Sequence, residues 1–235
     1  KASLAVNIQN FGNWNNTTID QLKLRAAYGE TGSSASFGSI FTSLNSVAIG
    51  GVGGSTIASL RGDANIEPET SQELEVGVDI RFIQKIGLEL TYYNRNVQDL
   101  ILSRSLPTSS GFSRETTNLA DLENRGLEVG ININAFDNDR FSWNSGIQFW
   151  LNRSEVTRLD VPPFPQPGAG FGLGLGTFYI QEGQPVTQLA GNINGVPTQI
   201  GNVEPDFQVS FNNNLTISKN LEIGFLIHWK EGGEN

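Results

Sequence analysis

The stretch that decides the fold is PETSQELEVGVDIRFIQKIGLELTYYNRNVQDLIL, residues 68–102. Apolar and polar residues alternate without a break over residues 73–82, and a second alternating run begins at Leu88. Successive side chains of a β-strand point to opposite faces, so each run predicts a strand with one apolar and one polar face. The few residues around Gln84 then predict the tight turn of a long antiparallel hairpin.

Two environments fit such a hairpin. A soluble β-protein buries the apolar face of its sheet and leaves the polar face in water. A transmembrane barrel does the reverse, because its apolar face meets lipid and its polar face lines the lumen. The connections between the strands distinguish the two.

Six further alternating segments predict a total of about eight strands. They lie near residues 3–8, 22–29, 127–134, 141–151, 207–217 and 221–229. Short links join the two strands of each successive pair, as at Asp137-Asn138-Asp139, whose side chains can cap their own backbone in a tight turn.

Long loops join one pair of strands to the next. They cover about 31–67, 103–118 and 160–205, and all nine prolines lie in them or at their edges. Short turns on one rim and long loops on the other are typical of outer-membrane barrels, whereas a β-sandwich has no reason to sort its loops by length. The sequence therefore predicts an all-β, antiparallel transmembrane β-barrel segment with long extracellular loops and short periplasmic turns.

Four aromatic residues are expected near the short-turn rim, namely Phe82, Phe136, Phe141 and Trp143. Rings at this height suit the aromatic girdle of a membrane protein. The same four rings would equally suit the packed core of a soluble protein at the end of a hairpin.

Composition excludes several classes of protein. No apolar run reaches the length of a membrane-spanning helix, and a net charge of −9 argues against nucleic acid as a partner. The chain contains no Cys, which excludes disulfides, thiolate metal sites and cysteine nucleophiles. It also contains no Met and does not begin like a signal peptide, so we expect an internal part of a longer polypeptide.

Five segments occur in the order seen in SusC-type (SusC/RagA-like) TonB-dependent outer-membrane transporters, and the chain resembles that family over nearly all of its length outside the long loops. They are DQLKLRAAYGETG (20–32), NIEPETSQELEVGVDIRF (65–82), GLELTYYNRNVQDLIL (87–102), NLADLENRGLEVGINI (118–133) and GNVEPDFQVSFNNNLTISKNLEIGFLIHWKEGGEN (201–235). The resemblance implies a barrel of about 22 strands with a plugged lumen. Residues 1–235 would all belong to the barrel, with the plug, the TonB box and the final strands lying elsewhere.

The resemblance also implies a function and partners. Such transporters import oligosaccharides or peptides with energy relayed by the TonB complex, and they work beneath a SusD-like surface lipoprotein while embedded in outer-membrane lipid. Many relatives carry an Asp-rich DxNxDG stretch before the PDF strand. Here only GNINGVPTQIGNVEPDF is present, which argues against a metal site in that loop.

No motif in the chain predicts catalysis, a cofactor or a metal centre. His228 is the only histidine and has no cysteine or second histidine as a partner. The glycine-rich residues 170–176 lack the strand, the helix and the GK[ST] ending of a phosphate-binding loop. No serine has the G-x-S-x-G setting of a hydrolase. We therefore expect a protein that is not an enzyme.

Charged residues gather on the polar face of three neighbouring predicted strands, with Lys23 and Arg25 nearby. They are Glu73, Glu75, Asp79, Arg81, Glu89 and Glu128. They either keep a lumen wall hydrated or pair reversibly with basic groups of the plug, since exposed ion pairs contribute only ~0–1 kcal/mol each.

Substrate contacts are expected at Tyr93, Arg95 and Phe112, because sugars stack on aromatic rings and hydrogen-bond to polar side chains. Two other functions remain open at the level of sequence. A passive porin-like channel would have the same strands. A soluble β-rich surface binding module would need its apolar faces buried.

Overall fold

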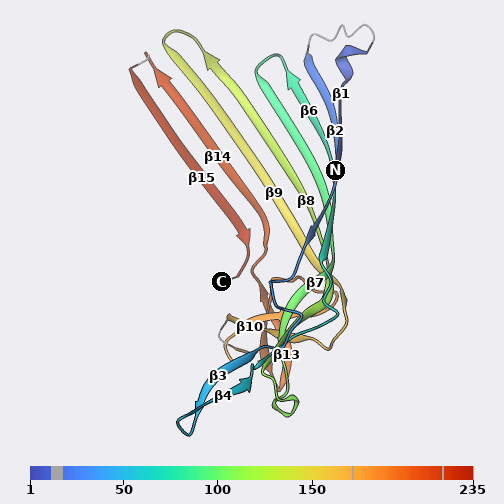
Figure 1. Ribbon diagram of the computed structural model, residues 1–235. Coiled ribbons are helices and arrows are strands. Elements are labelled where there is room, and N and C mark those ends of the chain that lie inside the picture. The colour runs from blue at the N-terminus through green and yellow to red at the C-terminus, as the bar shows by residue number, and fades with distance from the viewer. Residues whose placement is uncertain (12–17, 171, 219, 235) are drawn as a thin grey trace.

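The computed structural model describes residues 1–11, 18–170, 172–218 and 220–234. Eight strands form the antiparallel path of one nine-stranded sheet, in the order β1-β2-β6-β7-β8-β9-β14-β15 (Figure 1). The ninth strand, the two-residue β5 (Leu60–Arg61), pairs in parallel with β8. The bounds of the eight strands are β1 (Ala2–Asn7), β2 (Ile19–Ser33), β6 (Glu69–Phe82), β7 (Ile86–Ser105), β8 (Arg114–Asp137), β9 (Phe141–Leu159), β14 (Pro205–Ile217) and β15 (Leu221–Gly232). The eight predicted strands are confirmed, and each pairs with its neighbours in this order.

Further elements occupy the connections. They are the 3-10 helices η1 (Ile8–Asn10) and η2 (Thr108–Ser110) and the strands β3 (Leu44–Ile49), β4 (Val52–Ile57), β5 (Leu60–Arg61), β10 (Phe164–Gly170), β11 (Thr177–Ile180), β12 (Gln188–Ile193) and β13 (Val196–Asn202). Among the described residues, no helix is both long and apolar enough to cross a membrane.

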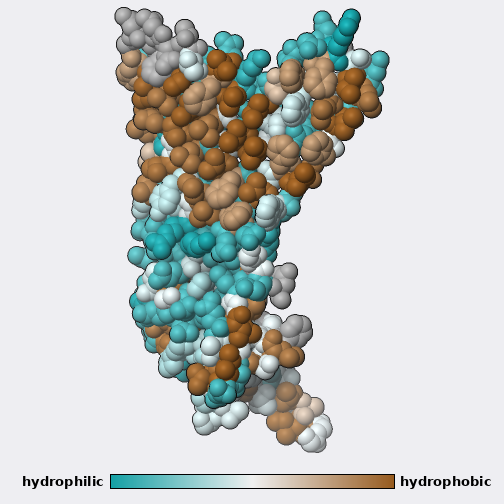
Figure 2. Space-filling view, turned by 180° about the vertical axis from the view of Figure 1, so that it is seen from behind, coloured by the Kyte–Doolittle hydropathy of each residue, from teal (hydrophilic) through white to brown (hydrophobic). Residues whose placement is uncertain are grey.

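One face of the long sheet carries an apolar belt on the side of the short turns. Figure 2 shows hydrophobic side chains gathered on this half of the face and hydrophilic ones toward the loops. On β8 the belt covers residues 127–136, close to the roughly 9–11 residues that a strand needs to cross a bilayer. It ends in a polar row in which Asn94, Arg125 and Arg153 lie side by side. β7, β8 and β9 contain 20, 24 and 19 residues, so all three continue well beyond the belt.

The short turns are built by local side-chain and backbone chemistry. Ile83 and Gln84 have φ of 42° and 55°, the left-handed pair of values that a tight type I′ hairpin turn requires. In the next turn the Oδ1 of Asn138 accepts hydrogen bonds from the backbone N–H groups of Arg140 and Phe141, at 3.0 and 2.9 Å. The predicted tight turn at residues 137–139 is confirmed.

Aromatic rings cluster on the belt next to these turns. Phe136 packs edge-on against Phe141 and stacks on Trp143, with ring centroids 5.9 and 6.2 Å apart. A bulge between Asn134 and Phe136 brings Phe136 opposite Trp143. The indole N–H of Trp143 donates to the Oδ1 of the buried Asn213 at 2.9 Å. Because Phe136 is 53% exposed, these rings form a surface girdle and not a packed core.

The predicted irregular loops over 31–67 and 103–118 are too long, because strands occupy part of each range. β2 continues to Ser33, and β3 and β4 form a separate hairpin around Gly50 and Gly51. Those two glycines have φ of 59° and 84°, so GGVGGS holds a turn and part of a strand where a loop was expected. Only residues 106–113 connect β7 to β8, because the two strands keep pairing beyond the belt.

The predicted loop over 160–205 also contains regular structure. β10 to β13 form a four-stranded sheet, and the sequence signal was hidden by the prolines of residues 162–167, which usually interrupt strands. This sheet packs on the extension of β8 and β9 through a small core of Ala120, Val156 and Ile180, each at most 1% exposed. The loop side of the molecule thus has its own hydrophobic core.

Candidate functional site

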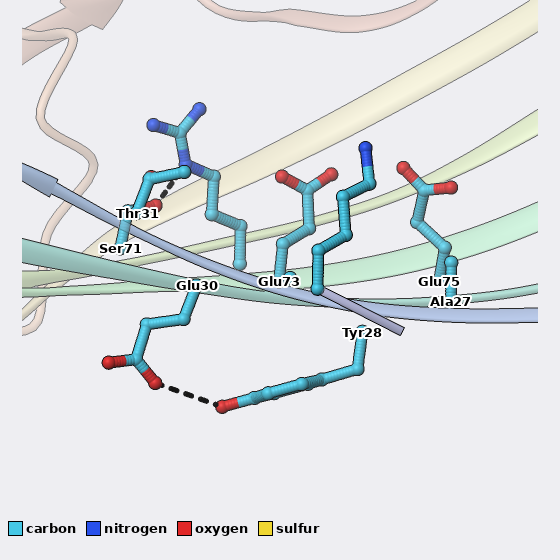
Figure 3. Close-up of a pocket in the computed structure, with 10 residues that line it drawn as sticks. Ala27, Tyr28, Glu30, Thr31, Ser71, Glu73 and Glu75 are labelled. Atoms are coloured by element: carbon cyan, nitrogen blue, oxygen red, sulfur yellow. Dashed lines mark hydrogen bonds between the residues drawn. The ribbon is translucent and has the colours of Figure 1, made fainter. Parts of the chain in front are cut away.

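The six charged residues expected on the polar face do share one face of the sheet. Cross-strand pairing joins Glu73 to Arg95, Glu75 to Tyr93, Asp79 to Glu89, Arg81 to Gly87 and Thr91 to Glu128. Partners in an antiparallel pair point to the same side of a sheet. Figure 3 shows Glu73 and Glu75 on one side of the strands and Tyr28 and Glu30 on the other.

Asp79 differs from the other five because basic residues of the sheet already neutralise it. Its carboxylate accepts a hydrogen bond from Arg25 Nε at 2.8 Å and lies 3.4 Å from Lys23 Nζ. Arg25 also donates to Thr91 Oγ1 at 3.1 Å and lies across Gly77, where an added Cβ would come within 2.9 Å of the guanidinium.

The remaining five charged groups stand free. Within the described parts of the chain, no ion pair forms to Glu73, Glu75, Arg81, Glu89 or Glu128. A hollow of about 360 Å³ opens beside Glu73 and Glu75, where β2 contributes the small residues Ala27 and Gly29 (Figure 3). Arg95 also lines it and donates to Ser71 Oγ at 2.8 Å.

Tyr93 is fixed at the centre of the polar face by its neighbours on β8 and β9. Its ring lies on Gly126, so close that a Cβ at position 126 would meet the ring at 2.3 Å. Its hydroxyl donates to Asn152 Oδ1 at 2.8 Å. Asn152 in turn donates to Glu204, whose carboxylate also accepts from the backbone and hydroxyl of Ser154. The chain of hydrogen bonds connects the wall to the base of the 160–205 segment.

Phe112 does not join Tyr93 and Arg95. It lies in the short connection after β7, which continues for ten residues beyond Arg95, roughly 30 Å at about 3.3 Å per residue. The three expected substrate contacts therefore form two groups, one on the wall and one at the outer tip.

Trp150 is a residue of the polar face that the sequence interpretation missed. It lines a second hollow of about 340 Å³ together with Glu89, Glu128 and Gln148. The ring of His228 packs against it with centroids 5.5 Å apart. The signal was available, because Trp150 stands between Gln148 and Asn152 in the polar register of its strand, but the sequence interpretation followed only the apolar face of that strand and gave Trp150 no role.

In the described ranges, no three His, Cys, Asp or Glu residues lie close enough together to hold a metal ion. Instead, the molecule offers a sheet with an apolar outer face, a polar inner wall and long connections at one rim only. Those features define a transmembrane β-barrel of the outer membrane.

The comparison with protein families identifies which kind of barrel. The chain belongs to the family described as "TonB dependent receptor-like, beta-barrel", whose profile matches residues 7–225. Proteins of this family are outer-membrane receptors and transporters and not enzymes. The expected resemblance to SusC-type transporters is confirmed by the relatives.

TonB-dependent receptor P3 of Formosa agariphila is 28% identical over 266 residues, which cover 92% of this chain and 26% of the receptor. TonB-dependent receptor SusC of Bacteroides thetaiotaomicron is 29% identical over 97 residues, 40% of this chain and 10% of that protein. The chain thus spans about a quarter or less of the length of these relatives.

Among solved structures, the RagAB peptide transporter matches with a TM-score of 0.84 and 16% identity, over 98% of this chain and 29% of that chain. The Escherichia coli outer membrane transporter YddB matches with a TM-score of 0.54 and 12% identity, over 90% and 27%. Both matches show that this chain shares its fold with part of those transporters.

Proposed function

We propose that the complete protein imports oligosaccharides or peptides across the outer membrane of a Gram-negative cell, with energy relayed by the TonB complex. In this proposal it is the SusC-like transporter beneath a SusD-like surface lipoprotein, and residues 1–235 cross the membrane several times. The family match over residues 7–225 carries the proposal. SusC among the relatives and the shared fold with the RagAB peptide transporter support it.

The test is uptake by cells that carry the full-length protein. Two labelled probes are offered separately, a tryptic digest of casein and a mixture of maltooligosaccharides. We expect accumulation of at least one probe to fall to background when either the protein or TonB is deleted. Accumulation that persists without TonB would identify a passive porin-like channel. Release of the protein from washed membranes without detergent would identify a soluble binding module.

The free charges of the wall are proposed to hold the plug. Glu73, Glu75, Glu89 and Glu128 would pair with basic groups of the plug and Arg81 with an acidic one, while Asp79 mainly orders Arg25 and Lys23. Each exposed pair contributes only ~0–1 kcal/mol, so the contact can release when TonB pulls.

Charge reversal tests this latch. We expect Glu75→Lys and Glu89→Lys to increase proteolysis of the plug in resting membranes and to change uptake. Glu155→Lys is the matched control, because Glu155 lies in the register of the outer face beyond the belt. Unchanged plug mobility and uptake in both wall variants would show that the charges serve only to hydrate the wall.

Substrate contacts are proposed at two stages of passage. Phe112 at the outer tip would meet the substrate first, and Tyr93 and Arg95 would contact it along the wall. Phe112→Ala should therefore raise the half-saturating probe concentration, whereas Tyr93→Phe should lower the maximal rate. If both variants kept the half-saturating concentration and the maximal uptake rate of the wild type, these residues would not contact the substrate.

A further inference from the structure

The outer face of the sheet changes from apolar to charged at a single row of residues. This row joins Asn94, Arg125 and Arg153 across β7, β8 and β9. One step nearer the short turns, Leu127 and Leu151 are still cross-strand partners in the apolar belt. Figure 2 shows the hydrophobic half of this face giving way to the hydrophilic half. The two arginines therefore lie at the level where the hydrocarbon of a membrane ends and its headgroups begin.

The two arginines differ in the partners that the chain gives them. They stand directly opposite each other, and like charges in that position are destabilising. Arg153 is held by β14, since it donates to the carbonyl oxygens of Pro205 and Asp206, both at 3.0 Å. Arg125 is exposed and, in the part of the chain that the structure describes, makes no ion pair and no side-chain hydrogen bond. The N–H donors of its guanidinium therefore face outward beside a second positive charge.

Tyr92 adds a hydroxyl group next to Arg125. It pairs with Leu127, so it stands one step from Arg125 on the same face of the sheet. Its side chain is 44% exposed, and no described residue is hydrogen-bonded to its hydroxyl. Tyrosine is enriched at membrane interfaces because its ring lies at the headgroup level with its polar end toward water. The rim thus offers a guanidinium and a hydroxyl side by side at that level.

Carboxylates farther from the belt restrict the side from which an anion can approach. Glu123 and Glu155 face each other beyond the arginines, two residues from Arg125 and Arg153. Glu123 is held in place by a hydrogen bond from Asn94 Nδ2 at 2.6 Å. A soluble anion that came from the loop side would pass these carboxylates and be repelled. An anion carried by a lipid comes from the belt side and meets the arginines first.

Phosphate is the lipid anion that fits this arrangement. A guanidinium presents a planar fork of donors that matches the oxygens of a phosphate, and such charge-assisted hydrogen bonds are stronger than neutral ones. Basic side chains at the membrane boundary bind anionic headgroups in the same way. The row lies on the side of the long connections, which the proposed function places outside the cell. In a Gram-negative cell, the leaflet on that side contains phosphorylated glycolipid.

We propose that Arg125, together with Arg153 and Tyr92, binds the phosphate group of an outer-leaflet glycolipid. The inference rests on the proposed placement in the outer membrane with the long connections outside, and it does not depend on the substrate or on TonB. The bound phosphate neutralises the two facing arginines. The tyrosine hydroxyl donates to the same phosphate or to the sugar that carries it.

Lipid binding by the full-length protein tests the site. The protein in detergent micelles is titrated with diphosphoryl lipid A, and the bound lipid is measured by native mass spectrometry. Arg125→Gln/Arg153→Gln should weaken binding about tenfold, because the charge-assisted hydrogen bonds to the phosphate are lost. Arg140→Gln is the matched control, an exposed arginine in the short turn after β8, and should leave binding unchanged. Equal binding by the double variant and the wild type, or an equal loss in the control, would overturn the proposal.

Other ligands identify the chemical group that is recognised. Dephosphorylated lipid A should bind the wild type about tenfold more weakly than diphosphoryl lipid A, for the same reason as in the double variant. Phosphatidylglycerol and inorganic phosphate should not displace lipid A at equal concentration. Undiminished binding of the dephosphorylated lipid, or displacement by either competitor, would show that the site does not select a glycolipid phosphate.

Photo-cross-linking in intact cells tests the position of the site and does not require the arginine variants to fold. A benzophenone amino acid at position 94 should capture lipopolysaccharide. Position 136, in the aromatic girdle on the same face near the short turns, is the control and should not capture it. No capture at position 94, or equal capture at both positions, would contradict the proposed site.

The lipid site and the proposed function fail in different ways. Uptake that requires TonB, combined with unchanged lipid A binding in Arg125→Gln/Arg153→Gln, would remove only the lipid site. Capture of lipopolysaccharide at position 136 in place of position 94 would reverse the proposed orientation of the barrel and with it the lipid site. Uptake that does not require TonB would remove the proposed function and leave the lipid site to the binding measurements.

Discussion

The turn-side half of the sheet and its loop-side half are built from the same strands but stabilised differently. On the turn side, residues alternate apart from bulges at Ile19–Gln21 and Asn134–Phe136, and the apolar belt is broken by few polar groups, such as Asn213. On the loop side, β7 and β8 bulge after Val97 and around Asp121, and Asp99 has a φ of 56°. Arg158 there holds the carboxylates of Asp99 and Asp121, at 3.0 and 2.8 Å, and also that of Asp160.

The surroundings explain the difference. Lipid offers no hydrogen bonds, so the backbone groups of the belt pair along the sheet and most outward side chains are apolar, while the polar Asn213 is buried and bonded to Trp143. Beyond the belt, water allows bulges and ion pairs, and the sheet of β10–β13 covers one region with a core around Val156. The predictions that follow test this contrast, beginning with the largest effect.

A charge in the belt should be the most damaging change. Leu90→Lys places an ammonium on the outer face of β7 and should lower the free energy of unfolding by about 2–4 kcal/mol, as for other lysines near the middle of a bilayer. Asn96→Lys is the control, on the same face of the same strand but beyond the belt, and should change the free energy of unfolding little. Urea unfolding in lipid vesicles compares the two, and equal losses would contradict the position of the belt.

A methyl group under Tyr93 should have the next largest effect. Gly126→Ala forces the ring and its hydrogen bond to Asn152 away from the wall, and such overpacking costs about 1–3 kcal/mol. Gly130→Ala is the matched control on β8, since its Cβ would lie an ordinary 3.6 Å from Glu89. Thermal unfolding of the barrel, followed by its gel mobility, measures both. Tyr93→Ala should rescue Gly126→Ala, and failure of rescue would contradict a clash with the ring.

The belt and its strands could be predicted from the sequence because alternation has a physical cause there. Lipid on one side and water on the other impose a period of two, which is why the segment from Leu74 to Phe82 was assigned correctly. Where both faces are covered, as at Leu119 and Ala120, the alternation is lost. Residues 119–126 of β8 were therefore assigned to no strand, and residues 114–118 to a loop. Trp150 was missed for a related reason, since an aromatic residue can face a polar lumen as readily as lipid.

Acid should loosen the loop side before the belt. The hydrogen bond from Arg158 lowers the pKa of Asp121 below its usual value, at a position outside the membrane-spanning part of β8. A carboxyl with a lowered pKa stabilises the fold above its unfolded-state pKa, and this contribution is lost as the pH falls through the folded-state pKa. Limited proteolysis of the 160–205 segment should therefore accelerate in that acidic range, and Asp121→Asn should make cleavage fast and less dependent on pH. Cleavage that depends equally on pH in the variant would contradict this role.

The smallest effect is expected from removing the hairpin of β3 and β4. These strands form a sheet of their own, and Leu44, Val52 and Ile57 are 68, 71 and 65% exposed, so they stabilise little of the barrel. The backbone N–H of Ala58 donates to the carbonyl of Ser43 at 2.9 Å, so a two-glycine link can replace residues 44–57. The free energy of unfolding should change by less than about 0.5 kcal/mol, as for surface changes in general.

Asn118→Ala provides the contrast within the same region. Asn118 accepts from the backbone N–H of Glu67 at 2.7 Å and donates to its carbonyl at 2.9 Å, which fastens the end of the 34–68 segment to β8. Because Asn118→Ala leaves those backbone groups unpaired, it should lower the free energy of unfolding by about 1–3 kcal/mol and accelerate proteolysis of the segment. If the deletion of the hairpin destabilised the barrel more than Asn118→Ala, the loop side would depend on the hairpin itself and not on the residues that anchor the segment.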